Sequence, residues 1–348
     1  MTDIGVHSGT VMTVTGPVPV DALGVTLMHE HILLDGDRAW RPTPGLDPAL
    51  TDSPVSLEIY GELRMNPYMN RDNVSLRSED DAVAELGQFR DLGGRTVVDP
   101  TNIGIGRNGP ALRRISEATG LKIVMGSGFY LEFSHPEWFA AMDVEALADL
   151  IVADCGGGPE APEVTAGLIG EIGVSKDFTP AERKSLTAAA RASARTGVPL
   201  MVHLPGWERL AHQVLDVAEG EGVDLRHLVL CHMNPSHSDL AYQTSLADRG
   251  AYLEYDMIGM DYYYADQDAQ SPSDEENARA IRTLVDAGHA DRVLLSQDIF
   301  LKMMLSRYGG FGYGYILRHF VPRLMRHGVD KAVIDAMLTD NPRRVFGG

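Results

Sequence analysis

Six side chains that commonly bind metal ions end or interrupt short apolar stretches of this sequence. They are His29, His31, Glu171, His203, His232 and Asp298. Side chains two residues apart share one face of a strand, so His29 and His31 can point to the same place. Imidazole and carboxylate groups are typical ligands of divalent transition metals. The set therefore predicts a metal centre rather than six unrelated core residues.

Glu171 is the one acidic residue of the stretch GLIGEIG, Gly167–Gly173. A lone buried carboxylate is costly unless it is paired or bound to a metal. Two cations that lie close together need a shared anionic ligand, and Glu171 is the expected bridge between them. The alternative is that Glu171 pairs with an arginine inside the fold.

Short apolar stretches alternate with longer amphipathic ones along the chain. The predicted strands are Gly24–His31, Thr96–Pro100, Lys122–Gly128, Ala166–Gly173, Pro199–Leu204, Leu228–Met233, Ala251–Ile258 and Arg292–Asp298. The predicted helices are Ser78–Leu92, Thr179–Thr196, Trp207–Gly220, Asp239–Arg249, Ser273–Ala287 and Phe311–His327. Eight such repeats predict an α/β fold, the (β/α)8 TIM barrel, whose active sites lie at the carboxyl ends of the strands. An open doubly wound sheet is the alternative, but the sequence lacks the Gly-rich phosphate loop expected of it.

We expect residues 1–348 to form a single domain with two additions to the barrel. Alternating Val and Thr around Thr15-Gly16-Pro17 predict a hairpin over Val6–Pro19, within an N-terminal extension of residues 1–23. Trp40–Asn73 is rich in Pro and Asn and follows the first predicted strand. In a barrel this long excursion would lie at the catalytic end and help cover the site.

Composition restricts the partners. The chain has 30 Lys and Arg against 49 Asp and Glu, a net charge of −19, which disfavours nucleic acid and anionic membranes. No apolar run is long enough to span a bilayer, and the first residues do not resemble a secretory signal. Two cysteines are too few for a disulfide framework. We therefore expect a cytoplasmic protein with a small-molecule substrate. Cys231 precedes a predicted ligand on its strand and is expected to face the helices as a small core residue.

Several longer stretches resemble the phosphotriesterase-related branch of the amidohydrolase superfamily. They are GVTLMHEHILLD, GGRTVVDPTNIGIGRN, IVMGSGFY, GLIGEIGVS, PLMVHL, DRGAYLEYD and LLSQDIFLKMMLSRYGGFGYGYILRHFVPRL. By this resemblance His29, His31 and Asp298 bind a more buried ion, and His203 and His232 bind a more exposed one. The best-known members bridge the two ions with a carboxylated lysine, whereas this chain has Glu171 there. Members often form homodimers, and no other macromolecular partner is expected.

The resemblance implies a hydrolase. Two divalent ions, most simply zinc, would generate a bridging hydroxide near neutral pH, and Asp298 would take up its proton as a catalytic residue. Tyr130 resembles a tyrosine that in lactonase relatives donates a hydrogen bond near the substrate carbonyl. The alternative for Tyr130 is an aromatic side chain that packs on a loop at the rim.

The loops give less information about the substrate. No Lys or Arg occurs between Arg249 and Arg279, so this loop offers no cation for a phosphate group. The run Tyr262–Tyr264 suggests an apolar or aromatic wall, with Tyr262 and Tyr263 as substrate contacts, unless these tyrosines mediate subunit packing. Lys302 and Arg307 are the cationic candidates for substrate binding. We therefore favour a lactone or another carboxylic ester. A phosphotriester or an N-acyl amide on the same centre is the alternative, and a non-catalytic, metal-containing binding protein is an alternative of another class.

Overall fold

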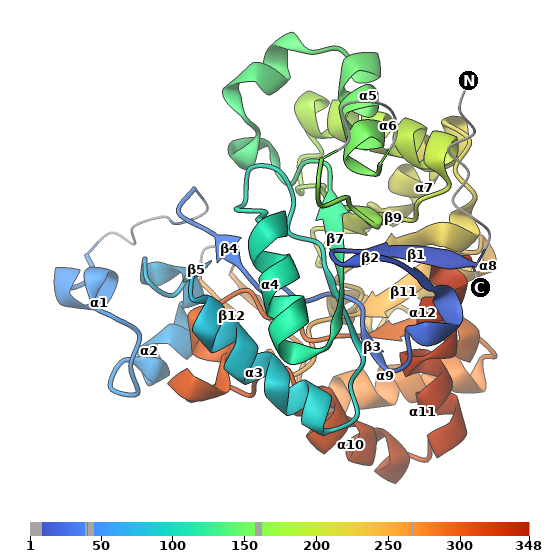
Figure 1. Cartoon of the computed structure of the whole chain (residues 1–348). Helices are drawn as coiled ribbons and strands as arrows, with labels where there is room; N and C mark the ends of the chain where they lie inside the picture. The colour runs from blue at the N-terminus through green and yellow to red at the C-terminus, as the bar shows by residue number, and fades with distance from the viewer. Residues whose placement is uncertain (1–8, 39, 41–44, 157–161, 266–267, 348) are drawn as a thin grey trace.

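Eight parallel strands form one sheet in the computed structural model, which describes residues 9–38, 40, 45–156, 162–265 and 268–347 (Figure 1). The strands are β3 (Thr26–Leu27), β6 (Thr96–Asp99), β7 (Lys122–Ser127), β8 (Leu168–Gly173), β9 (Leu200–His203), β10 (Leu228–Leu230), β11 (Tyr252–Tyr255) and β14 (Val293–Leu295). Each pairs with the next in this order, from β3 at one end to β14 at the other. Every strand lies inside a predicted stretch, so the prediction of eight strands is confirmed.

Main-chain contacts just beyond β3 and β14 close the sheet. The Asp298 N–H donates to the His29 carbonyl at 3.1 Å, and the His31 N–H donates to the Ile299 carbonyl at 3.1 Å. The buried Glu30 carboxylate accepts hydrogen bonds from the main-chain N–H groups of Gln297 and Ile299, both at 2.9 Å. The sheet is thus a TIM barrel, and the open doubly wound alternative is excluded.

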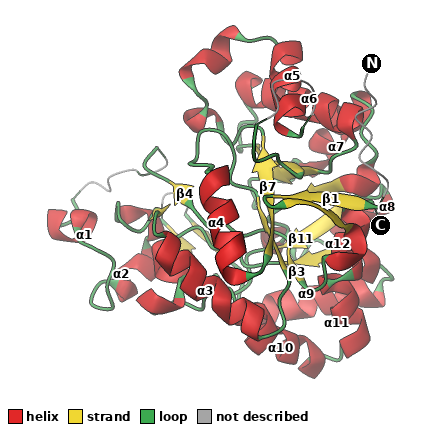
Figure 2. Cartoon of the chain, in the orientation of Figure 1, coloured by secondary structure: helices red, strands yellow, loops and turns green. Residues whose placement is uncertain are grey.

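Helices cover the outside of the barrel (Figure 2). They are α1 (Pro48–Asp52), α2 (Tyr60–Met65), α3 (Glu79–Asp91), α4 (Gly109–Thr119), α5 (Val144–Asp154), α6 (Pro180–Thr196), α7 (Ala211–Gly220), α8 (Leu240–Asp248), α9 (Asp274–Asp286), α10 (Val321–Arg326), α11 (Lys331–Leu338) and α12 (Asp340–Val345). The α6 helix begins with the capping box expected from its sequence, in which the Thr179 side chain accepts from the Glu182 N–H at 3.2 Å. Within the described residues, no helix combines the length and apolar character needed to cross a bilayer.

Some helices differ from the prediction. The α7 helix begins at Ala211 rather than at Trp207, because the chain before it forms a loop over the carboxyl end of β9. The stretch predicted as Phe311–His327 contains a π-helix, Ile316–Phe320, followed by α10. Pro322 lacks the N–H that would continue a regular helical hydrogen-bond pattern there. The α1, α2, α4, α5, α11 and α12 helices were not predicted from the sequence.

The N-terminal hairpin closes the end of the barrel opposite the site. Strand β1 (Thr10–Thr13) pairs antiparallel with β2 (Gly16–Pro19), which confirms the hairpin except for residues 6–8, which lie outside the described residues. Val11 and Val20 are buried with inward-facing barrel residues such as Val124 and Met201. Phe346, just after α12, belongs to the same apolar cluster.

Loops at the opposite end of the barrel contain two pairs of two-residue antiparallel strands. Strand β4 (Leu34–Asp35) pairs with β5 (Ser75–Leu76), and the excursion predicted over residues 40–73 lies between them and carries α1 and α2. After β11, strand β12 (Tyr263–Tyr264) pairs with β13 (Ala269–Gln270). Both segments contribute side chains to the cavity described below.

A buried carboxylate on α3 holds the loop that follows β14. Glu85 accepts hydrogen bonds from the Ser306 N–H at 2.9 Å, the Ser306 hydroxyl at 2.8 Å and the Arg307 N–H at 2.9 Å. Glu85 is far along the chain from this loop, so the three bonds tie an outer helix to the catalytic end of the barrel.

Replacing Glu85 tests this anchor. We expect Glu85→Gln to lower the free energy of unfolding by about 1–3 kcal/mol, because an amide nitrogen would face donors that need an acceptor. Urea denaturation followed by circular dichroism would measure the change. The matched control is Glu117→Gln on the exposed face of α4, where we expect almost no change. Equal midpoints for the two variants would show that Glu85 does not stabilise the loop.

Candidate metal centre

The barrel brings all six predicted ligands together at the carboxyl ends of its strands. His29 and His31 follow β3, Glu171 lies in β8, and His203 ends β9. His232 and Asp298 lie just beyond β10 and β14. All are buried except His203, which is partly exposed to the cavity above.

One group of these side chains surrounds a point between His29 and His31. The Nε2 atoms of His29 and His31 lie 3.6 and 3.3 Å from the Glu171 carboxylate. The same two nitrogens lie 3.5 and 3.4 Å from Oδ1 of Asp298. Four side chains therefore face one another at separations suited to coordination of one ion.

A second group shares Glu171 with the first. The Nδ1 atom of His203 and the Nε2 atom of His232 lie 2.7 Å apart, and they lie 3.2 and 3.7 Å from Oε2 of Glu171. Glu171 thus contacts both histidine pairs. This arrangement differs from the arginine pair considered as the alternative, because imidazoles surround the carboxylate.

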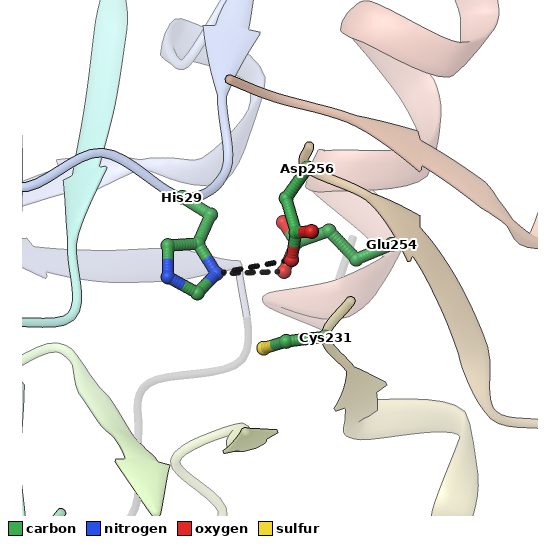
Figure 3. Close-up of side chains that lie close together, drawn as sticks. All are labelled: His29, Cys231, Glu254 and Asp256. Carbon is green, nitrogen blue, oxygen red and sulfur yellow. Dashed lines mark hydrogen bonds and ion pairs between the residues drawn. The ribbon is translucent and has the colours of Figure 1, made fainter. Parts of the chain in front are cut away.

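The outer nitrogens of the histidines are held by residues behind them. His29 Nδ1 lies 3.3 Å from Glu254 and 3.4 Å from Asp256 (Figure 3). Asp256 also lies 3.0 Å from His232 Nδ1. His31 Nδ1 lies 2.7 Å from the Thr101 hydroxyl. Such contacts orient metal-binding imidazoles and select the tautomer.

The inner nitrogen of His29 supports metal binding by this site. His29 Nε2 is buried and has no hydrogen-bond partner, although it points at two carboxylates. Buried polar atoms without a partner are rare and call for an explanation. The mixture of imidazole nitrogens and carboxylate oxygens suits zinc and similar divalent ions. The residues present therefore fit a metal centre.

Burial and neighbouring charges shift the pKa values of the side chains in this cluster. Some of these side chains then hold protons that a bound cation would displace. Burial opposes ionisation of Glu171, but His29, His203 and His232 hold its pKa well below the ordinary value. Burial alone would lower the pKa of His232, but Asp256 raises it to about 10. Burial raises the pKa of Asp298 to about 7. Metal binding would therefore release protons from this site.

Two of the predicted ligands have unusual backbone conformations. His232 and Asp298 have φ values of 57° and 47°, a left-handed region that is uncommon for residues other than Gly. Such strain is often found at functional sites. Because both residues lie beyond their strands, the alternation of side chains does not extend to them.

This break makes the prediction for Cys231 wrong. Cys231 does not face the helices. It is buried in the barrel interior beside His29 and Glu254 (Figure 3). Burial raises the pKa of its thiol well above the ordinary value. The expectation that it is a small core residue rather than a nucleophile agrees with this environment.

A cavity of about 530 Å³ opens above the candidate metal centre. The Tyr130 side chain lines it and places its hydroxyl 3.4 Å from Nδ1 of His203. Burial and the charge of Glu171 raise the pKa of Tyr130, so the phenol stays protonated and can donate a hydrogen bond. The structure thus places Tyr130 beside the cluster rather than on an outer rim.

The predicted aromatic wall is present, but of the run Tyr262–Tyr264 only Tyr264 is among the described residues that line the cavity. Four rings contact one another in a row and line the cavity; they are Phe300, Tyr68, Tyr264 and Trp207. Neighbouring ring centroids lie 5.9–6.1 Å apart. Tyr262 and Tyr263 are not among the described residues that line the cavity. Tyr262 is buried, and Tyr263 hydrogen bonds to Asp268.

Lys302 and Arg307 also lie away from the described lining of this cavity. Lys302 pairs with Asp72, and Arg307 pairs with Asp81 on α3. Both cations thus connect the loop after β14 to neighbouring segments. This placement gives no support to a role for either residue in substrate binding.

Sequence reasoning missed the residues that hold the histidines. Glu254 and Asp256 occur two residues apart at the end of the apolar strand β11, a pattern like that of His29 and His31, and this signal could have identified them. Thr101 has no comparable signal. The ring of Tyr264 was part of the tyrosine run, but nothing in the sequence distinguished it from its neighbours.

Comparison with known proteins agrees with this geometry. The pattern of the phosphotriesterase family matches residues 9–346. A resiniferatoxin-binding protein from Rhodobacter sphaeroides is 56% identical, with a TM-score of 0.95 and 98% of this chain and 96% of that chain covered. An N-acetyltaurine hydrolase from Tetraodon nigroviridis is 37% identical over 97% of each chain. A lactonase from Listeria monocytogenes is 26% identical, with a TM-score of 0.77 over 97% and 98% of the chains.

The match to the family extends over nearly the whole chain, and the relatives named as hydrolases cover 97% of it. The chain therefore belongs to the phosphotriesterase family and is a phosphotriesterase-like hydrolase.

Proposed function

We propose that this protein is a binuclear metal-dependent hydrolase that cleaves N-acyl amides. The observation that carries the proposal is the position of Glu171, which contacts both pairs of histidines. One carboxylate between two such groups is suited to bridge two divalent ions, most simply zinc. Bound there, the two ions would lower the pKa of a water molecule and polarise an acyl carbonyl group.

The chain supplies two further groups for the reaction. The Asp298 carboxylate faces His29 and His31 and lines the cavity, so it can take the proton that water loses on attacking the acyl carbon. The same carboxyl group can then pass this proton to the departing amine. The Tyr130 phenol can donate a hydrogen bond to the acyl oxygen and keep it oriented.

The names of the relatives favour an amide over an ester as the substrate of this protein. The sequence alone favoured a lactone or another carboxylic ester, and the lactonase from Listeria monocytogenes keeps that class as the second candidate. The relatives named N-acetyltaurine hydrolase act on an amide and are more similar to this chain, at 37% identity for the one from Tetraodon nigroviridis. The wall of Phe300, Tyr68, Tyr264 and Trp207 supports an apolar acyl part larger than acetyl.

A binding function without turnover is the competing class, and the resiniferatoxin-binding protein carries such a name. A purely binding site has no need of a proton acceptor such as Asp298 at the base of the cavity. Hydrolysis therefore accounts for more of the arrangement than binding does.

Metal analysis combined with a hydrolysis screen tests the proposal. We expect about two zinc-class ions per chain and turnover that chelation abolishes and zinc restores. The panel would hold N-acetyl and N-phenylacetyl amides, matched aryl esters, lactones and a phosphotriester. The amides with the larger acyl group should give the highest kcat/KM. Fewer than one ion per chain after reconstitution, together with no turnover, would support the binding function instead.

Asp298→Asn separates proton transfer from substrate binding. We expect kcat to fall by about 10²–10⁴-fold, because the amide cannot accept the proton, while metal remains bound through the other ligands. Steady-state kinetics and metal analysis of the same preparation would measure both properties. Asp224→Asn, at an exposed turn before β10, is the control and should leave kcat unchanged. A kcat within threefold of wild type in Asp298→Asn would rule out this role.

Asp256→Asn tests the support behind the two histidines. Asp256 contacts both His29 and His232, so we expect metal affinity to weaken by about 10–100-fold. Competition with a chromophoric chelator would give the affinity. The control is Asp154→Asn, which removes another partly buried carboxylate, the one that pairs with Arg107 at 2.6 Å. Unchanged affinity in Asp256→Asn would show that this carboxylate does not position the ligands.

A further inference from the structure

Arg38 contributes a strongly basic side chain to the described lining of the cavity. Arg38 is the single Lys or Arg among the described residues that line it. The chain as a whole carries a net charge of −19, so an arginine at this place does not reflect a generally basic surface. A guanidinium group remains positively charged at any physiological pH. Arg38 therefore brings a fixed positive charge to the cavity wall.

Main-chain carbonyl groups hold the Arg38 side chain. Its Nη1 atom donates to the carbonyl oxygens of Ser134 and His135, at 3.2 and 3.3 Å. These residues belong to the loop after β7, which also carries Tyr130. These two hydrogen bonds orient the guanidinium group toward the loop after β7. Arg38 thus lies on the side of the cavity mouth that the β7 loop forms.

The opposite side of the mouth is apolar. Tyr264 follows β11, and β11 lies four places from β7 in the order of the eight strands, which is half of the ring. Tyr264 belongs to the row of four rings described above. The cavity therefore has Arg38 on the side of the β7 loop, where Tyr130 and Phe133 also line it, and the ring of Tyr264 on the other side, with the candidate metal centre at its base.

We propose that Arg38 is a specificity-determining residue that binds an anionic group, a carboxylate or a sulfonate, on the amine part of the substrate. The acyl part then lies against the aromatic wall, and the amide bond lies between them above the candidate metal centre. This inference rests on the proposed amide hydrolysis. Guanidinium groups suit both anions because they can donate two parallel hydrogen bonds.

The acidic residue nearest in sequence that also lines the cavity does not oppose this role. Asp35 has its own partner in Arg77, at 3.2 Å. The carboxylates of Glu171 and Asp298 face the histidines at the base. An anionic substrate group would thus meet Arg38 on the upper wall, while the carboxylates of the base are engaged elsewhere.

Paired substrates and variants test the assignment. Wild type, Arg38→Gln and Arg38→Lys would be assayed on N-acetyltaurine and on its neutral sulfonamide counterpart. For Arg38→Gln we expect kcat/KM on N-acetyltaurine to fall about 10- to 100-fold, mainly through KM, as for loss of a charge-assisted hydrogen bond. The sulfonamide should change less than twofold, and Arg38→Lys should recover part of the loss. Arg64→Gln, an exposed arginine of α2 outside the described lining, is the control.

Calorimetric binding of N-acetyltaurine to chelator-treated protein gives a second measurement that needs no turnover. Weaker binding by Arg38→Gln than by wild type would support the assignment, even if no amide were hydrolysed and the proposed function failed. Equal losses on charged and neutral substrates, or no loss on either, would overturn it while leaving amide hydrolysis intact. Binding equal to that of wild type would also overturn it.

Discussion

A buried carboxylate among four imidazoles is the constraint on which the rest of the site depends. Glu171 lies almost completely out of water, and an ionised carboxylate is tolerated there only beside compensating positive charge. Protonated imidazoles can supply this charge, and divalent ions can supply more of it. Closing the barrel is what makes the arrangement possible, because β3, β8 and β9 then end around one point.

The same constraint explains why carboxylates lie behind the candidate ligands. Asp256 contacts His232 through both the imidazole and the main-chain N–H, and it contacts His29 as well. Glu30 joins the loop after β14 to the end of β3 and so fixes Asp298 relative to His29. These carboxylates fix the positions of the candidate ligand side chains relative to the strands. A displacement of either carboxylate would move several candidate ligands together, because each carboxylate contacts more than one segment of the chain.

Much of the barrel and the ligand set could be predicted from the sequence, because each depends on local patterns. A strand that ends in histidine or aspartate can be recognised without its neighbours, and all eight strands lay where their apolar stretches indicated. The conformation beyond each strand could not be predicted in this way. His232 adopts a left-handed backbone after β10, and alternation from Cys231 therefore pointed to the wrong side. Tyr264 rather than Tyr263 reached the cavity for a related reason, since the register of a two-residue strand has no sequence signal.

Contacts between residues far apart in the chain set a second limit on what the sequence can predict. This limit affects the prediction of substrate specificity. Lys302 and Arg307 looked available because their partners, Asp72 and Asp81, lie more than two hundred residues away in the chain. Arg38 reaches the cavity because the loop after β7 holds it. The base of the cavity is built from strand ends, whereas the wall is built from loops that fold against one another. The family includes relatives named as an N-acetyltaurine hydrolase and as a lactonase. In this chain the shape of the cavity wall depends on contacts between loops that no single motif encodes.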